Sequence, residues 1–390
     1  MKAPWPLAVT AAFITTLALA PPASAAPAVQ VTELPLPEGY TLQGPPDINA
    51  RGQIAAAAVS DETRRSRIVR WDPEPGGGYD TTVLTEGPHV SSLLARINDR
   101  GDVLAPEALD LVIWDARGRK VATVASLRDL SGYSGFLPPG FNDRRQVLYG
   151  KGMGDMSGLP AAAVLWSPGG QAELTRPDGS ATVDPGDLND RGEAMGTATG
   201  TGSGFRWDGR TTTLFRGPDG ESVYWMIDFN DRGQALGITH GGTRAFVNHR
   251  GVSQDIGTLG GPGTYLHPFG SGAINDRGQV AGASATAGGT MHPFIWHRGK
   301  MTDLGTLGGE ATALYQATAT DINNRGQVIG QSMTAAGELH PYAWHRGRMH
   351  DLHVPGFRDA VPSEINDRGQ AIGRATSPTG TLRPLLWTLH

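Results

Sequence analysis

The sequence predicts an all-β repeat fold, and three observations support that prediction. A unit that approximates hydrophobic-Asn-Asp-Arg-Gly-Gln recurs eight times in the 390 residues. A tryptophan follows the Asn in seven of the eight copies, after 16 to 24 residues. Each repeat offers four short apolar stretches, which Gly, Pro and Asn interrupt too often for helices. Four short strands in about 45 residues are typical of a propeller blade, so we expect a β-propeller of eight four-stranded blades.

The Asn of the unit marks each repeat. Successive copies are 41 to 49 residues apart, and the residue two positions after the Asn is arginine in all eight copies. The next residue is glycine in seven copies and Arg145 in the third. Because repeats one to three match the pattern loosely, a propeller of seven blades with an irregular first repeat is the alternative. The marking residues are Asn49, Asn98, Asn142, Asn189, Asn230, Asn275, Asn323 and Asn366.

The ends of the repeat region predict that the ring closes. The chain stops after Trp387 without the Thr-Asp-Leu strand that residues 301–304 supply in the sixth repeat. Residues 31–34 precede the first unit and look like that missing strand. An N-terminal strand that completed the last blade would leave no unpaired sheet edge. An open solenoid would normally have distinct capping repeats, so we expect residues 26–390 to form one closed propeller.

The first 25 residues predict export. Lys2 forms a short basic region, residues 7–20 are apolar, and Ala-Ser-Ala at 23–25 is a small-residue cleavage site. The apolar run of about 14 residues is shorter than the roughly 20 that a membrane-spanning helix needs, and two prolines end it. We therefore expect cleavage after about Ala25 and a secreted, soluble chain that does not insert into a membrane.

Composition limits the classes of partner. The net charge is −5 and both signs are scattered along the chain, so nothing points to nucleic acid or to an anionic membrane surface. The chain has no cysteine, so an exported protein of this sequence must be stabilised by a large core and by hydrogen bonds instead of disulfides.

The later repeats resemble a known family. The segments Ile-Asn-Asp-Arg-Gly-Gln-Val at 274–280, His-Pro-Phe-Ile-Trp at 292–296 and Asp-Leu-Gly-Thr-Leu-Gly-Gly at 303–309 together resemble the extracellular HAF-repeat family, named for a His-Ala-Phe-like tripeptide. Related tripeptides occur at 340–342 and 244–246. The resemblance is strong in repeats six to eight, and it implies export and a repeat fold with no established reaction.

The Asn-Asp-Arg-Gly turn is predicted to be structural. Asn can accept hydrogen bonds from its own turn two residues on, and Gly readily adopts the positive φ of tight connections. The unit lacks the alternating oxygen ligands of a calcium loop. Acidic residues two positions before the Asn are predicted to form exposed pairs with the motif arginines, although such pairs are individually weak; they are Asp47, Asp187, Asp228, Asp321 and Glu364.

The repeated tryptophans are interpreted as core residues between neighbouring blades, in preference to a sugar-stacking surface. Asn248 takes the tryptophan position in the fifth repeat. Tyr224 and Trp225 fall outside the repeat register, so they are the candidate ligand-binding residues. Other departures from the pattern are Arg145 and the insertion at residues 151–160.

Histidines gather in repeats six and seven, but a shared metal ion is not predicted. His292 and His340 occupy the same repeat position, as do His297 and His345, so most pairs would lie a full blade apart. No local motif of a zinc hydrolase, a phosphate-binding loop or a serine nucleophile occurs. We therefore predict neither a metal site nor a cofactor, and the sequence identifies no catalytic residue.

The leading functional hypothesis is an extracellular binding or scaffold module that presents loops to a glycan, a peptide or a protein. The alternative is a secreted polysaccharide lyase or glycoside hydrolase with its site at one mouth of the channel. The two differ in one structural respect. Convergent, non-repeated Asp, Glu, His or Tyr side chains would favour the enzyme, whereas a channel lined only by equivalent repeat positions would favour the binding module.

Overall fold

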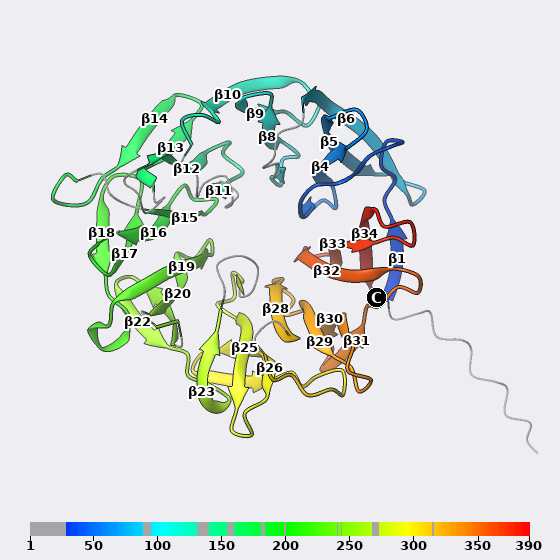
Figure 1. Cartoon of the computed structure of the whole chain (residues 1–390). Coiled ribbons are helices and arrows are strands. Elements are labelled where there is room, and N and C mark those ends of the chain that lie inside the picture. The colour runs from blue at the N-terminus through cyan, green and yellow to red at the C-terminus, as the bar shows by residue number, and fades with distance from the viewer. Residues whose placement is uncertain are drawn as a thin grey trace, which may run out of the picture.

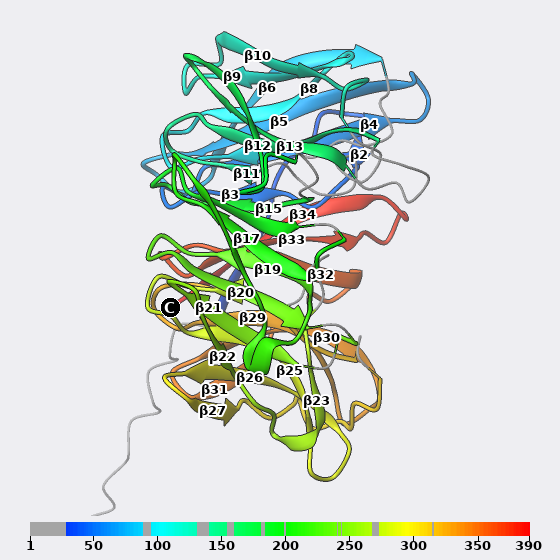
Figure 2. The same ribbon diagram turned by 90° about the vertical axis from the view of Figure 1, so that its left-hand side faces the viewer.

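The protein is an eight-bladed β-propeller (Figure 1). Seen from the side, the blades form a disc (Figure 2). Each blade is an antiparallel sheet, and blades 1 and 6 contain a fifth short strand because their inner strand is split in two. This computed structural model describes residues 29–88, 95–130, 140–153, 160–180, 184–198, 200–239, 241–242, 244–266, 273–313 and 316–390. The prediction of eight blades is confirmed, and the loosely matching repeats one to three form complete blades.

The strands follow the repeats in order, and each blade is numbered by the Asn unit it contains. Blades 1 and 2 consist of β2 (Thr41–Leu42), β3 (Asp47–Ile48), β4 (Ile54–Ser60), β5 (Arg65–Pro73) and β6 (Tyr79–Pro88), then β7 (Arg96–Ile97), β8 (Val103–Glu107), β9 (Asp110–Trp114) and β10 (Lys120–Ser126). Blades 3 and 4 consist of β11 (Gly140–Phe141), β12 (Val147–Met153), β13 (Pro160–Ser167) and β14 (Gly170–Leu174), then β15 (Asp184–Leu188), β16 (Ala194–Ala198), β17 (Ser203–Trp207) and β18 (Thr212–Phe215).

The second half of the ring repeats the same order. After a 3-10 turn at Pro218–Gly220, blades 5 and 6 consist of β19 (Val223–Phe229), β20 (Gln234–Thr239), β21 (Ala245–His249) and β22 (Val252–Asp255), then β23 (Gly260–Tyr265), β24 (Ala273–Ile274), β25 (Val280–Thr286), β26 (Met291–His297) and β27 (Lys300–Asp303). Blades 7 and 8 consist of β28 (Ala317–Ile322), β29 (Val328–Met333), β30 (Leu339–His345) and β31 (Arg348–Asp351), then β32 (Arg358–Ile365), β33 (Gln370–Thr376), β34 (Leu382–Leu389) and β1 (Val29–Glu33).

The N-terminal strand β1 closes the ring, as the sequence predicts. It pairs antiparallel with β34, so the first and last strands of the chain lie side by side (Figure 1). The register places Val31 opposite Trp387, and this matches Met301 opposite Trp296 in blade 6. The outer strand of blade 8 is thus supplied by a segment more than 350 residues away from β34 in sequence, which joins the chain ends without a covalent link.

A hydrogen bond to an acidic side chain, made by His or Arg at the same repeat position, links the third and outer strands in four blades. In blade 8, Arg383 Nε lies 2.6 Å from Glu33 Oε1. In blade 6, the first residue of the His-Pro-Phe tripeptide makes the equivalent contact, with His292 Nδ1 2.9 Å from Asp303 Oδ1. The other two pairs are Arg244 with Asp255 and His340 with Asp351. The His or Arg of the tripeptide and the acidic residue of the following strand therefore hold the third and outer strands of a blade together.

Four of the seven repeated tryptophans are buried in the core, as predicted, and the other three, Trp166, Trp207 and Trp344, are half-buried and pack against its apolar clusters. Trp71 and Trp387 have no exposed surface, and Trp114 and Trp296 are 2% and 4% exposed. Trp114 of blade 2 belongs to one apolar cluster with Ala55 and Ile68 of blade 1. Since a buried aromatic side chain removes a large apolar area from water, these residues join each blade to its neighbour.

Candidate functional site

The Asn of each unit organises the turn that ends the inner strand of its blade. In blade 1, Asn49 Oδ1 accepts hydrogen bonds from the backbone N–H of Arg51 at 3.0 Å and of Gln53 at 2.9 Å. Its Nδ2 donates to Gln53 Oε1 at 3.0 Å. Gly52 has φ +81°, in the left-handed region that glycine adopts without strain. The same bonds from backbone N–H to the Asn recur in all eight blades, so the predicted structural role of the motif is confirmed.

The eight Asn side chains also form a closed ring, which the sequence does not reveal. The second hydrogen of each Nδ2 is donated to the backbone carbonyl of the Asn in the next blade, at distances from 2.8 to 3.2 Å. The last of these bonds runs from Asn366 to Asn49 and completes the circle. Each Asn is therefore fully bonded and nearly buried, which leaves this side chain with no free group for a ligand.

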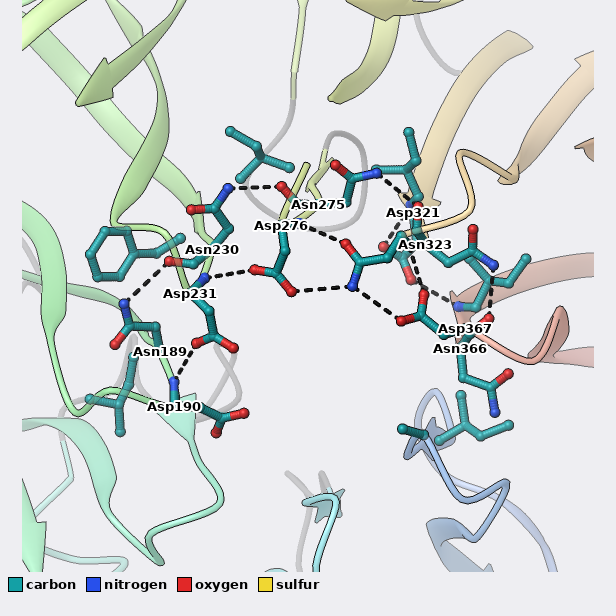
Figure 3. A pocket seen from close by; sticks show the side chains of 18 residues that line it. Asn189, Asp190, Asn230, Asp231, Asn275, Asp276, Asp321, Asn323, Asn366 and Asp367 are labelled. Carbon is teal, nitrogen blue, oxygen red and sulfur yellow. Dashed lines mark hydrogen bonds between the residues drawn. The ribbon is translucent and has the colours of Figure 1, made fainter. Parts of the chain in front are cut away.

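A second ring, of carboxylates, lies beside the Asn ring at the mouth of the channel. The residue after each Asn accepts, through Oδ1, the backbone N–H of its counterpart in the preceding blade, as Asp276 does from Asp231 at 2.9 Å (Figure 3). Seven such bonds run from residue 50 to residue 367. The ring is open at Ala50, which has no side-chain acceptor. Its members are Asp99, Asp143, Asp190, Asp231, Asp276, Asn324 and Asp367.

These rings surround the mouth of a cavity of about 340 Å³. The residues that line it occupy four repeat positions: the Asn, the residue after it and the two residues before it. Burial, to which the charges of neighbouring carboxylates add, raises the pKa of Asp143, Asp190 and Asp231. The mouth is thus a repeated polar surface that carries six carboxylates and one amide in its inner ring.

Behind the mouth lies a third layer, formed by the residues two positions before the Asn. Asp47 and Glu364 contact Arg96, which occupies the same position in blade 2, with Arg96 Nη1 2.7 Å from Glu364 Oε1 and 3.6 Å from Asp47 Oδ2. Asp228 and Asp321 each accept a backbone N–H of the next blade, from Ile274 at 2.7 Å and Ile365 at 2.8 Å respectively.

The predicted pairing of these acidic residues with the motif arginines is wrong. Among the residues that the structure describes, the ion pairs of Asp47 and Glu364 are with Arg96. The physical reason is position. The acidic residues lie along the inner strand behind the mouth, whereas each motif arginine lies beyond the Asn in the turn, where all eight are exposed.

Burial changes the acid strength of this third layer. Burial, and then the charge of Asp228, raises the pKa of Asp187 to about 7, and burial also raises the pKa of Asp228. Burial raises the pKa of Asp321 to about 6. The pKa of Glu364 is also raised, by burial and by the nearby Asp47. The channel therefore holds carboxyl groups that titrate above their ordinary range.

One departure from the motif is a matched exchange between blades 2 and 3. In the six blades whose unit has Gln, this side chain lies against the turn glycine of the next blade, so a Cβ at Gly101 would be 2.6 Å from Gln53 Oε1. Blade 2 has the shorter Asp102 in place of Gln, and this leaves room for Arg145 in place of the next glycine. Arg145 binds both oxygens of Asp102, each at 2.7 Å, although its φ is +61°.

The two sequence-predicted ligand residues have different environments. Tyr224 is 51% exposed near the start of β19, at the opposite end of that strand from the Asn turn. Trp225 is half-buried and packs against the apolar cluster that contains Leu236 and Ile238. Neither residue lines the cavity of the mouth. Asn248 is buried and donates to Ser253 Oγ at 2.9 Å, and part of the insertion at 151–160 lies outside the described residues.

Within the described residues, no three His, Asp, Glu or Cys side chains are placed to hold a metal ion. His292 and His340 each bond an aspartate of their own blade, and His353 stacks on His340 with ring centroids 4.5 Å apart. No helix of the described part is long and apolar enough to span a bilayer. The proposed signal peptide lies outside the described residues.

Together these features define the class: a closed eight-bladed propeller whose mouth is built from repeated Asn and Asp turns. No family model and no curated protein matches the sequence. Solved propellers are similar in fold. A streptogramin B lyase is 12% identical with a TM-score of 0.48 and covers 93% of this chain and 98% of its own. A virginiamycin B lyase from Staphylococcus aureus is 10% identical with a TM-score of 0.46, over 93% and 100%.

A third similar structure, from a study of two prolyl endopeptidases, is 13% identical with a TM-score of 0.50. It covers 90% of this chain, but this chain spans only 54% of its length. At these identities the likeness concerns the fold alone.

Proposed function

We propose that this protein is an extracellular binding module, in which the propeller is a rigid scaffold and the mouth formed by the Asn turns is the docking face. One observation carries the proposal. Among the residues that the structure describes, every one that lines the cavity at the mouth occupies an equivalent repeat position, and no non-repeated His, Tyr or Glu of this described part converges there. A catalytic centre needs different groups with different roles at one point, whereas a repeated polar rim suits the display of many similar contacts to a glycan, a peptide or a protein.

A thermal-shift screen tests this proposal. The chain from residue 26 to 390 would be heated with divalent ions, with a chelator, with neutral and charged glycans and with basic and acidic peptides. A ligand that binds the folded state alone raises its melting temperature by mass action. We expect a shift with at least one glycan or peptide class.

A matched pair of variants locates the binding. Asp190→Asn with Asp231→Asn keeps the oxygen that accepts the neighbouring N–H, as Asn324 does in the native ring, and removes two charges from the mouth. Glu62→Gln with Glu310→Gln removes two exposed charges elsewhere. We expect the first pair of changes to alter the ligand-induced shift, decreasing it for a cationic ligand and increasing it for an anionic one. A shift that neither pair of changes alters, or the absence of any shift, would contradict docking at the mouth.

A hydrolase or lyase is the second candidate function, and one observation favours it. The charge of Asp228 acts on Asp187 and burial raises the pKa of both carboxyl groups, and carboxyl groups with a raised pKa are used in acid-base catalysis. The test is release of reducing ends or unsaturated products from polysaccharides by the wild-type chain. Turnover that Asp187→Asn abolishes would replace the binding proposal with an enzymatic one.

A further inference from the structure

We infer that the eight motif arginines form a docking surface for an anionic polysaccharide, and that its strongest part is the arc of Arg325, Arg368 and Arg51. This inference rests on the proposed binding function and specifies its partner. The arc covers blades 7, 8 and 1, where the ring of blades is closed by the N-terminal strand.

The structure gives every other position of the motif a structural task. The Asn caps its turn and bonds the next blade, the residue after it accepts a neighbouring N–H, and the glycine adopts positive φ beside the Gln of the preceding blade. The arginine contributes its backbone N–H to the turn, which any residue except proline could do. Yet the arginine side chain is present in all eight copies and exposed in all of them.

Few of these guanidinium groups are used within the chain. Arg191 pairs with Glu193 at 2.6 Å and Arg100 approaches Asp102 at 3.8 Å. Arg368 Nη1 donates to the carbonyl of Arg51 at 2.7 Å, which draws two members of the arc together. Among the described residues, no ion pair joins Arg325, Arg51 or Arg368 to a carboxylate.

The inner ring makes this arc the most cationic part of the mouth. The ring residues beside its three arginines are Asn324, Asp367 and Ala50, so one carboxylate faces three guanidinium groups. On the other side of the ring, each arginine of blades 2 to 6 follows an aspartate. An anion would therefore be attracted along the rim of blades 7, 8 and 1 and repelled from the centre of the mouth, where carboxylates gather.

Guanidinium chemistry indicates the ligand. A planar fork of N–H donors matches the two oxygens of a carboxylate or a sulfate, and a guanidinium is more weakly hydrated than an ammonium. The chain has 33 Lys and Arg residues, and the motif position is Arg in every copy and never Lys. Exposed ion pairs are individually weak, but a polymer with a charge on successive sugars engages several at once and gains from multivalency.

A polysaccharide fits this surface better than a single-stranded nucleic acid. Such nucleic acids bind through aromatic side chains on which their bases stack, together with basic residues. The motif supplies no aromatic side chain at its Asn, Asp, Arg, Gly or Gln positions in any copy. Sugars that carry carboxylates or sulfates need only the guanidinium groups and hydrogen bonds.

The arginines could instead serve only to balance the carboxylate ring. The charges of Arg100 and Arg191 do offset part of the rise in the pKa of Asp143 and Asp231 that burial causes. That role predicts that removing arginines destabilises the fold most where ring carboxylates are dense. The docking role predicts a loss of binding where carboxylates are sparse, with the melting temperature almost unchanged, so two readouts separate the roles.

The experiment compares two triple variants of the full mature chain. The first is Arg51→Gln, Arg325→Gln and Arg368→Gln, and the second removes the same charge from blades 3, 5 and 6 by Arg144→Gln, Arg232→Gln and Arg277→Gln. Binding of polygalacturonate and of dextran sulfate is measured at two salt concentrations, with methyl-esterified polygalacturonate and a single-stranded oligonucleotide as controls. A double variant, Arg51→Gln with Arg325→Gln, keeps Arg368 and its hydrogen bond to the carbonyl of residue 51, so it controls for a loss of ring closure.

We expect the wild type to bind at least one anionic polymer, with an affinity that falls as salt rises. The first triple variant should bind it about tenfold or more weakly at an unchanged melting temperature, and the second about threefold or less. Equal losses in the two triples, no binding of either polymer, or tighter binding of the oligonucleotide would overturn the inference. The proposed binding function is tested by a different result: it is wrong if no ligand of the thermal-shift screen gives a shift that the changes at the mouth alter.

Discussion

The exchange of Asp102 and Arg145 gives a quantitative test of how neighbouring turns are matched. Restoring the consensus in one partner should destabilise the protein, and restoring it in both should not. The changes are Asp102→Gln, Arg145→Gly and the double variant. The two side chains form a bidentate pair, and the Asp102 side chain is 1% exposed.

The magnitudes follow from this geometry. Arg145→Gly leaves a buried carboxylate without its cation, which costs about 3–5 kcal/mol, and relief of the left-handed backbone returns about 1 kcal/mol. Asp102→Gln removes the ion pair and places a longer side chain against Arg145, at a position where the other blades have a glycine. We therefore expect it to lower the free energy of unfolding by about 3 kcal/mol. The double variant should lie within about 1 kcal/mol of the wild type, which gives a coupling energy of about 4–8 kcal/mol.

Thermal and urea unfolding of the four proteins would measure this cycle. At about 2.1 cal/mol/K per residue, the 365 residues from 26 to 390 melt with an entropy of roughly 0.8 kcal/mol/K, so 3 kcal/mol lowers Tm by about 4 °C. If the effects of the two single changes sum to the effect of the double variant within about 0.5 kcal/mol, the two turns are not matched and the reasoning is refuted.

Three further predictions concern the rings and the closure. Ala50→Asn should supply the missing acceptor for the N–H of Asp367 and stabilise the protein by about 0.5–1.5 kcal/mol in thermal unfolding, whereas Ala50→Val should not. Because burial raises the pKa of Asp187 above its unfolded value, the stability from this group is full below about pH 4 and is lost as pH rises through the folded pKa of about 7. Asp187→Asn mimics the protonated form, so it should stabilise the protein at pH 8 by on the order of 1–3 kcal/mol and flatten Tm between pH 5 and 8; an unchanged profile would contradict the raised pKa of Asp187. A chain that begins at Leu34 should lose β1, expose the edge of β34 and oligomerise or unfold, as light scattering and circular dichroism would show; a stable monomer would contradict the closure.

The fold could be predicted because its evidence is local and repeated. Residues 31–34 resemble residues 301–304 closely enough to place β1 beside β34, and the structure adds the equivalent ion pair of Glu33 with Arg383. The Asn cap could be predicted for the same reason, since its partners lie two and four residues away.

The mouth could not be predicted, because its contacts join residues 41 to 49 positions apart. A single unit shows the Asn capping its own turn, but not that its remaining hydrogen reaches the next blade. The partners of the acidic residues in the third layer could not be predicted for a related reason. Arg96 pairs with Glu364 across 268 residues, and only the closure of the ring brings them together.

Tyr224 and Trp225 do not line the cavity of the mouth, and their role in ligand binding stays a prediction. Both lie outside the repeat register, yet the strand alternates its faces, so Tyr224 is exposed and Trp225 packs on the core. The residues that line the mouth are instead those that the repeat makes most regular. In a propeller whose channel is built by equivalent turns, the positions that repeat in every blade are the ones that line the channel.

The circle of Asn side chains has a consequence for how the molecule comes apart. In a linear stack of repeats the terminal unit has one neighbour, so fraying can begin there and spread inward. Here each Asn donates to one neighbour and accepts from the other, all in the same rotational sense, and Asn366 returns to Asn49. No blade is terminal, and the release of any one must break contacts on both of its sides. Unfolding is therefore expected to be a single cooperative event despite the modular sequence.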